Sequence, residues 1–131
     1  MMNQLFWDKI RRGGQGSQNG IIAYIEDLVA LKHEVQAKGI CGFDRFLSEK
    51  ASAFEQFATR MIVNGFPPTL CAEVLLNVLN SSTFTDKEYF KNAIFAEFIL
   101  SLQGEDHGNQ ELRLRLYSYL GIDGVKKMQL E

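Results

Sequence analysis

The sequence predicts an all-α fold, a compact bundle of about five or six helices. Apolar side chains recur every three or four residues along most of the chain, which is the spacing of one face of an α-helix. Glycine, proline and short polar runs separate these segments and mark the turns between helices. Residues 111–120 also suit a strand, but a single strand would have no partner to complete a sheet.

Length and composition are those of one globular domain. The 131 residues are 46% hydrophobic and 23% charged, which is too apolar for a disordered chain. A chain of this length buries about two thirds of its unfolded surface and can fold without disulfides or a metal. We expect a short N-terminal helix in residues 1–12, a glycine-rich linker in residues 13–20 and a single helical domain in residues 21–131.

The N-terminal helix is predicted to lack a clean apolar face, because its apolar residues spread around the circumference with Lys9 among them. The following "GGQGSQNG" combines glycine with small polar residues, which is typical of a flexible linker. A glycine-rich turn can also expose backbone N–H groups to a phosphate. This segment has no Gly-Lys-Ser/Thr, and a GxGxxG pattern would need glycine at Asn19. It therefore predicts a linker and no phosphate loop.

The first long helix is predicted over residues 21–38. Gly39 follows it at the position where a left-handed residue ends a helix, and a shorter helix is expected around residues 43–47. The apolar residues that recur at helical spacing in the first of these are Ile21, Ile25, Leu28, Val29 and Val35.

The next helix is predicted over residues 51–63, with its apolar face formed by Phe54, Phe57, Ala58, Met61 and Ile62. It is followed by "NGFPP" and by another apolar helix, residues 69–80, whose pattern includes Leu70, Val74, Leu75, Val78 and Leu79.

The "NGFPP" segment predicts a rigid corner between these two helices. Asn64 and Gly65 both tolerate positive φ, so the first helix can end there. Pro67 and Pro68 cannot continue that helix, but proline suits the first turn of a new one. We expect these four residues to have a structural role and to set the angle between the helices.

A helix over residues 86–103 has the strongest start signal in the chain. Thr85 and Glu88 have the spacing of a capping box, in which each side chain accepts a hydrogen bond from the backbone N–H of the other residue. Phe84 and Tyr89 occupy the positions of a hydrophobic staple.

The C-terminal part is predicted to contain one more helix. Residues 104–109 form a polar loop, and Asn109 can cap the helix that follows. The segment "ELRLRLYSYL" is assigned to that helix, which ends at Gly121. We expect residues 122–131 to be partly frayed.

Charge and hydropathy exclude two classes of partner. The net charge is −2 with both signs mixed along the chain, so there is no basic patch of the kind that binds nucleic acid. No apolar stretch approaches the roughly 18 residues of a membrane span, because Glu73, Asn77 and Glu97 interrupt the longest ones. The N-terminus also lacks the apolar core of a signal peptide. The sequence therefore predicts a soluble, cytoplasmic protein without a membrane span.

Cysteine and histidine positions predict neither a metal site nor a cofactor. Cys41 and Cys71 belong to no CxxC spacing, so both are expected to be reduced thiols, with Cys71 on an apolar helix face. His33 has no ligand-type residue four positions before or after it. His107 follows two acidic residues in a loop, which makes a weak cation site at best.

One stretch resembles a known family. The segment "IEDLVALKHEVQAKGICGFDRFL" resembles the first cytoplasmic helix of the MotA family, the ion-channel subunits of the flagellar stator. Gly39, Phe43 and Asp44 match that family's glycine, apolar position and acid. Family members use the acid, with an arginine three residues before the glycine, to engage the rotor's switch protein. The arginine position is Gln36 here, so the resemblance implies a partner contact through Asp44, with Lys38 as the substitute charge.

A second stretch extends this resemblance. The segment "MIVNGFPPTLCAEVLL" is similar to the family's pattern of an apolar helix ending in Asn/Asp-Gly, followed by proline and a Glu-containing helix. The resemblance covers residues 21–80 and omits all four membrane spans of the family. It therefore implies no ion channel and no proton-carrying site.

The function predicted from these observations is a protein-protein interaction or adaptor module, which the resemblance relates to the flagellar motor. A small-molecule or lipid binder with a Phe-lined cavity is an alternative, which an enclosed cavity above about 300 Å³ would favour. An exposed apolar patch would favour the interaction module. A small enzyme would need a site around Cys41, His33 and Asp44, or around Asp106 and His107. The excess of apolar helix faces is compatible with a homodimer.

Overall fold

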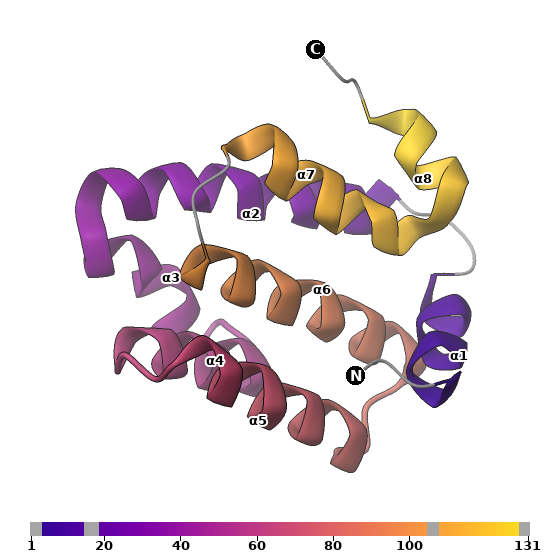
Figure 1. The fold of residues 1–131 in the computed structure, drawn as a ribbon, viewed down its shortest axis with the longest axis horizontal. Coiled ribbons are helices and arrows are strands. Elements are labelled where there is room, and N and C mark those ends of the chain that lie inside the picture. The colour runs from indigo at the N-terminus through magenta and orange to yellow at the C-terminus, as the bar shows by residue number, and fades with distance from the viewer. Residues whose placement is uncertain (1–3, 15–18, 105–107, 129–131) are drawn as a thin grey trace.

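The computed structural model describes residues 4–14, 19–104 and 108–128, and this part of the chain is helical without a strand (Figure 1). The all-α prediction is confirmed, and the helix count is slightly above the predicted five or six because α8 lies in a segment that was expected to fray. The α-helices are α1 Gln4–Gly13, α2 Asn19–Lys38, α3 Asp44–Leu47, α4 Ala53–Val63, α5 Pro68–Ser81, α6 Asp86–Gln103, α7 Asn109–Tyr117 and α8 Gly121–Lys127. Two 3₁₀ segments join them, η1 Gly39–Phe43 and η2 Ser118–Leu120.

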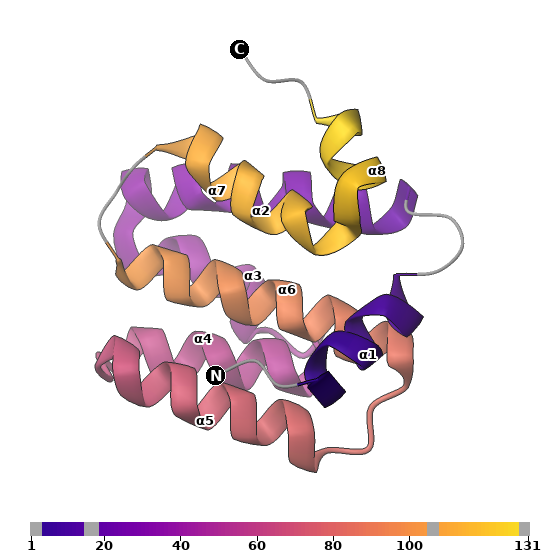
Figure 2. The ribbon, with the colours of Figure 1, turned by 45° about the vertical axis from the view of Figure 1, so that its right-hand side comes forward.

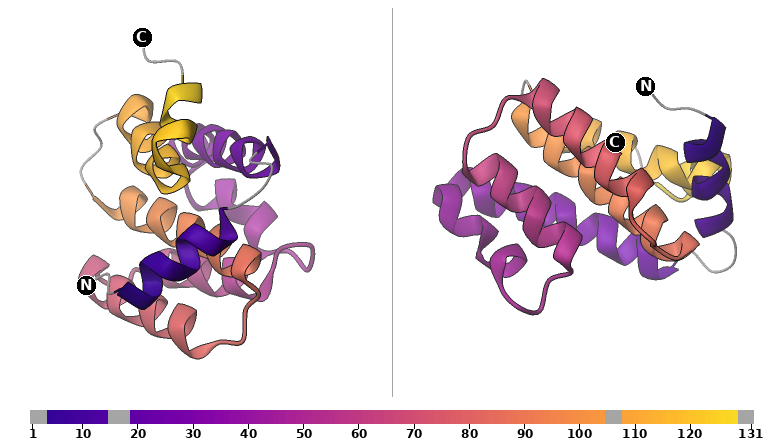
Figure 3. Two further views of the ribbon diagram at one scale, coloured as in Figure 1. Left: turned by 90° about the vertical axis from the view of Figure 1, so that its right-hand side faces the viewer. Right: turned by 90° about the horizontal axis from the view of Figure 1, so that it is seen from below.

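Helix α6 is the centre of the bundle. It lies between a layer formed by α2 and α7 and a layer formed by α4 and α5 (Figures 1 and 2), and it contacts all four. Helix α1 crosses one end of the bundle and also packs on α6 (Figure 3). A helix in such a position buries side chains on more than one face, and the exposed residues of α6 lie mainly in its first two turns. The buried residues of α6 are Tyr89, Phe90, Asn92, Ala93, Ile94, Phe95, Ala96, Phe98 and Ile99.

Two capping boxes fix the beginnings of α4 and α6. In α6 the predicted box is present: the backbone N–H of Glu88 donates to Thr85 Oγ1 at 3.1 Å, and that of Thr85 donates to Glu88 Oε1 at 2.8 Å. The same reciprocal pair joins Ser52 and Glu55, at 3.1 and 2.9 Å. Helix α4 consequently begins at Ala53, later than predicted.

Helix α1 has an apolar face, contrary to the expectation from its sequence. Phe6 and Ile10 are buried in the common core, and Gly13 continues the same stripe one turn later. A Cβ atom at Gly13 would lie 2.3 Å from the backbone oxygen of Asp86, so glycine permits a close approach of α1 to α6. Gly13 thus belongs to α1, Asn19 and Gly20 begin α2, and residues 15–18 lie outside the described part.

The C-terminal region is more ordered than the sequence predicts. Residues 109–117 are helical, as assigned, but Gly108 occupies the N-cap position that was expected for Asn109. The segment expected to fray contains α8. Met128, directly after α8, is only 6% exposed and packs in the core, which fixes the end of this helix. Residues 129–131 lie outside the described part of the chain.

Candidate functional site

The two charged residues expected to contact a partner lie on either side of η1. Lys38 is the last residue of α2 and Asp44 is the first residue of α3. Both are exposed, and neither side chain makes a hydrogen bond or ion pair with another residue in the described ranges. Their charges are therefore available to another molecule.

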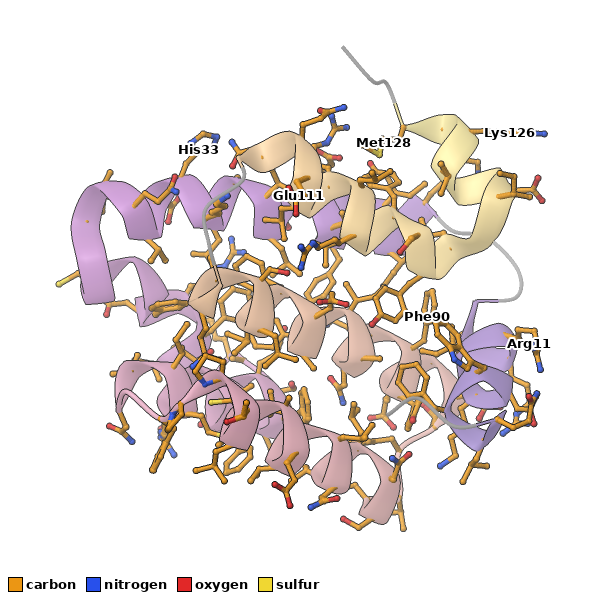
Figure 4. All side chains as sticks on the ribbon, viewed as in Figure 1. Arg11, His33, Phe90, Glu111, Lys126 and Met128 are labelled. Atoms are coloured by element: carbon orange, nitrogen blue, oxygen red, sulfur yellow. The ribbon has the colours of Figure 1, made fainter. Side chains whose placement is uncertain are left out.

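The residues proposed for an enzyme do not form an assembled site in the described part of the chain. The ring of His33 contacts the side-chain amide of Asn109, which joins α2 to the start of α7 (Figure 4). Cys41 is an exposed thiol and Cys71 a buried one. No group of three or more His, Cys, Asp or Glu side chains among the described residues could hold a metal. Asp106 and His107 lie outside those residues.

The corner at residues 64–68 has the geometry expected of a helix stop followed by a helix start. Gly65 takes a φ of +78°, whereas Asn64 remains at −81° and needs no left-handed conformation. Pro67 caps α5 in an extended conformation, and Pro68 is the first residue of the helix.

Phe66, at the centre of this corner, is held by three elements. Its backbone N–H donates to the carbonyl of Met61 in α4 at 3.2 Å. Its own carbonyl accepts from Gln103 Nε2 of α6 at 2.8 Å and from the Cys71 thiol of α5 at 3.6 Å. The backbone of the corner is consequently fixed against the central helix.

Three large apolar side chains on the two helices and the corner between them are exposed. Phe57, Phe66 and Leu70 are 39%, 43% and 40% exposed, and we call these three residues the corner surface. Met61 and Cys71 both hydrogen-bond to the backbone of Phe66. Phe57 lies one helical turn before Met61 in α4, and Leu70 directly precedes Cys71 in α5. Helical periodicity placed Phe57 and Leu70 in the core, and the structure corrects this.

Charged residues flank the corner surface. Arg60 follows Phe57 by one turn of α4, and Glu73 follows Leu70 by one turn of α5. Both are exposed, and neither forms an ion pair with a described residue. An apolar centre with an unpaired cation and an unpaired anion at its edge is suited to binding a protein surface.

No family model, no curated protein and no solved structure matches the chain. Within the described ranges, every helix is too short or too polar to cross a bilayer.

Proposed function

We propose that this chain is a protein-interaction module that presents the corner surface to another protein chain. The observation that carries the proposal is the exposure of Phe57, Phe66 and Leu70 on one helical hairpin. Single exposed apolar side chains are common, but neighbouring large ones with a polar edge are typical of protein-binding surfaces. Aromatic side chains are also enriched at the centres of interfaces.

The rigidity of the corner supports this proposal. Binding costs less entropy when the contacting segment is already held in one conformation. Gln103 and Cys71 both hold the carbonyl of Phe66, and the two prolines restrict the backbone that follows.

A second copy of the chain is one partner that would fit. In a twofold dimer the same patch faces itself, so Arg60 of each copy can pair with Glu73 of the other. A different protein with an apolar knob and a polar rim would fit as well. The proposal includes a cytoplasmic location, with which the exposed free thiol of Cys41 is consistent.

The stator resemblance suggests a second binding surface. It would use Asp44 and Lys38, and its partner would be a rotor switch protein. The exposure of both side chains and their lack of partners among the described residues favour this candidate.

Site-specific photo-crosslinking tests the corner surface. The photoreactive residue benzoylphenylalanine would replace Phe66 or Leu70 in separate full-length variants, and Lys126 on α8 would serve as the control position. Lys126 points away from the bundle (Figure 4). After irradiation of the producing cells, cross-linked proteins would be identified by mass spectrometry.

We expect both corner positions to give the same cross-linked protein, which is either the chain itself or one other protein. Lys126 should not give it. Phe66→Ser, introduced into the variant that carries benzoylphenylalanine at position 70, should reduce the cross-linking yield while the protein stays folded, because the Phe66 side chain is 43% exposed. Equal cross-linking at all three positions, or none at the corner, would overturn the proposal.

A further inference from the structure

A groove near the start of α6, at the other end of this helix from the corner, is lined by backbone, aromatic rings and charged side chains. It lies between the end of α1, the first turns of α2 and the first turns of α6, and it has a volume of about 440 Å³. Pockets of about 300 to 1,000 Å³ are typical of small-molecule sites. The groove is open to solvent and shares no lining residue with the corner surface.

Glycine gives this groove bare backbone walls. Gly13, Gly14 and Gly20 all line it, and a Cβ atom at Gly20 would meet nothing within 4 Å. Gly20 lies in the first turn of α2, a helix of 20 residues. The N–H groups of a first helical turn have no acceptor within the helix, and the helix dipole makes this end positive.

Two lysines of α6 face the same space. Lys87 and Lys91 are one helical turn apart and both line the groove. Lys87 makes no hydrogen bond or ion pair with a described residue. Like charges at this spacing repel each other, so an anion between them would relieve an unfavourable interaction.

The remaining charges near the groove only partly offset these lysines. Asp86, which directly precedes Lys87, pairs with Arg12 Nε at 3.2 Å. Asp27 lies on the α2 wall and forms no ion pair with either lysine. The lining therefore carries two cations and one anion, with the positive end of α2 beside them.

Aromatic rings complete the walls. The ammonium of Lys91 lies 4.6 Å from the centroid of the Tyr24 ring. Tyr24 is fixed because its hydroxyl donates to Glu55 Oε2 at 2.6 Å, and burial, followed by the Glu55 carboxylate, raises the pKa of this phenol. It stays neutral and presents its ring to the groove. Phe90 is a buried lining residue at the α1 end of α6 (Figure 4).

We propose that this groove binds a small phosphate monoester, with the phosphate between Lys87, Lys91 and the start of α2, and the organic part against Tyr24 and Phe90. Phosphate fits two ammonium groups beside a helix N-terminus. The site differs from a phosphate loop, since the glycine-rich segment has no lysine and both lysines come from α6. It is independent of the proposed function of the corner surface.

Titration of the full-length chain with four probes tests this site. The probes are inorganic phosphate, AMP, glycerol 3-phosphate and adenosine, in a buffer without phosphate, and the readout is the backbone amide NMR spectrum. We expect saturable shifts at Gly14, Gly20 and Ala23 with all three phosphates up to about 10 mM. If AMP binds more tightly than glycerol 3-phosphate, the ligand is of the nucleotide type. If glycerol 3-phosphate binds more tightly, the ligand is a sugar phosphate or a lipid phosphate.

Three variants distinguish binding in this groove from non-specific binding of anions to the protein surface. Lys87→Gln should weaken phosphate and AMP binding by about tenfold, because it removes one charge-assisted contact. Asp27→Asn should tighten binding, because it removes the only acidic group of the lining. Lys126→Gln should leave binding unchanged. All three side chains are exposed, so the fold should persist.

Three outcomes would overturn the proposal. One is the absence of saturable shifts with inorganic phosphate and AMP. The second is adenosine binding as tightly as AMP, which would make the phosphate irrelevant. The third is equal weakening by Lys87→Gln and Lys126→Gln, which would mean that anions bind to the surface without a defined site.

Discussion

The side-chain amide of Gln103, at the end of α6, donates a 2.8 Å hydrogen bond to the backbone carbonyl of Phe66 in the corner between α4 and α5. The bond joins residues 37 positions apart and ties an exposed turn to the central helix. It explains how a corner with only one positive-φ residue keeps a fixed orientation relative to the core.

Loss of this hydrogen bond should be measurable. Gln103→Ala leaves the Phe66 carbonyl with only the weaker Cys71 thiol as a donor. We expect the free energy of unfolding to fall by about 1 kcal/mol, the usual contribution of such a bond. Urea unfolding of both proteins measures the difference. Gln110→Ala, at an exposed position of α7, is the control and should change stability little.

Gly65→Val should destabilise the protein by about 1 kcal/mol or more. The φ of +78° at Gly65 is strained for a β-branched residue, although a Cβ atom there would meet nothing within 4 Å. The effect would therefore come from the backbone alone. Gly104→Val is the matched control, because Gly104 has an extended backbone with φ −87° and ψ −172°. Equal melting temperatures for the two variants would contradict this account of the corner.

Gly13→Ala should destabilise the protein for a steric reason, by about 1 to 3 kcal/mol. The added Cβ atom would lie 2.3 Å from the Asp86 carbonyl oxygen and 2.5 Å from Phe90 Cβ, so α1 would have to move away from α6. Gly20→Ala adds a methyl group where nothing lies within 4 Å, and it should leave stability equal or slightly higher. Thermal melts of both variants separate a glycine in a close helix contact from a glycine in an open helical position.

The capping box of α6 should make stability sensitive to acid. The backbone N–H of Thr85, and then its hydroxyl, lower the pKa of the Glu88 carboxyl. Because the pKa is lower in the folded state, the contribution of Glu88 is present above its unfolded pKa and is lost as pH falls through the folded value. Glu88→Gln should therefore lose less stability than the parent protein between pH 7 and pH 3 in urea unfolding. Glu34→Gln, an exposed control, should follow the parent.

The parts of the fold that sequence predicted are those specified by local chemistry. The Thr85 and Glu88 pair marked the start of α6, and Gly39 adopts the positive φ expected after α2. The start of α4 was predicted two residues too early, although Ser52 and Glu55 have the same capping-box spacing. The buried face of α1 was not predicted, because one of its three residues is Gly13. Glycine has no apolar side chain to add to a periodic pattern, although Gly13 packs closely against α6.

Both candidate sites depend on tertiary packing, which periodicity does not determine. Phe57 and Leu70 have helical spacing like their buried neighbours, but they are 39% and 40% exposed. The groove likewise requires Lys87 and Lys91 to lie beside glycines about 70 positions earlier in the chain. No local pattern relates those segments.

Asp44→Ala separates the stator resemblance from the corner surface. The Asp44 side chain is exposed and contacts no described residue, so its removal should change the free energy of unfolding by less than about 0.5 kcal/mol. If the resemblance reflects a shared partner, the same variant should bind a purified flagellar switch protein more weakly than the parent in surface plasmon resonance. Phe66→Ser should leave that affinity unchanged, because it alters a different surface. Two results would remove the support that Asp44 gives to the resemblance: the parent protein does not bind the switch protein, or Asp44→Ala binds it as tightly as the parent does. In either case the corner surface would remain the proposed interaction site.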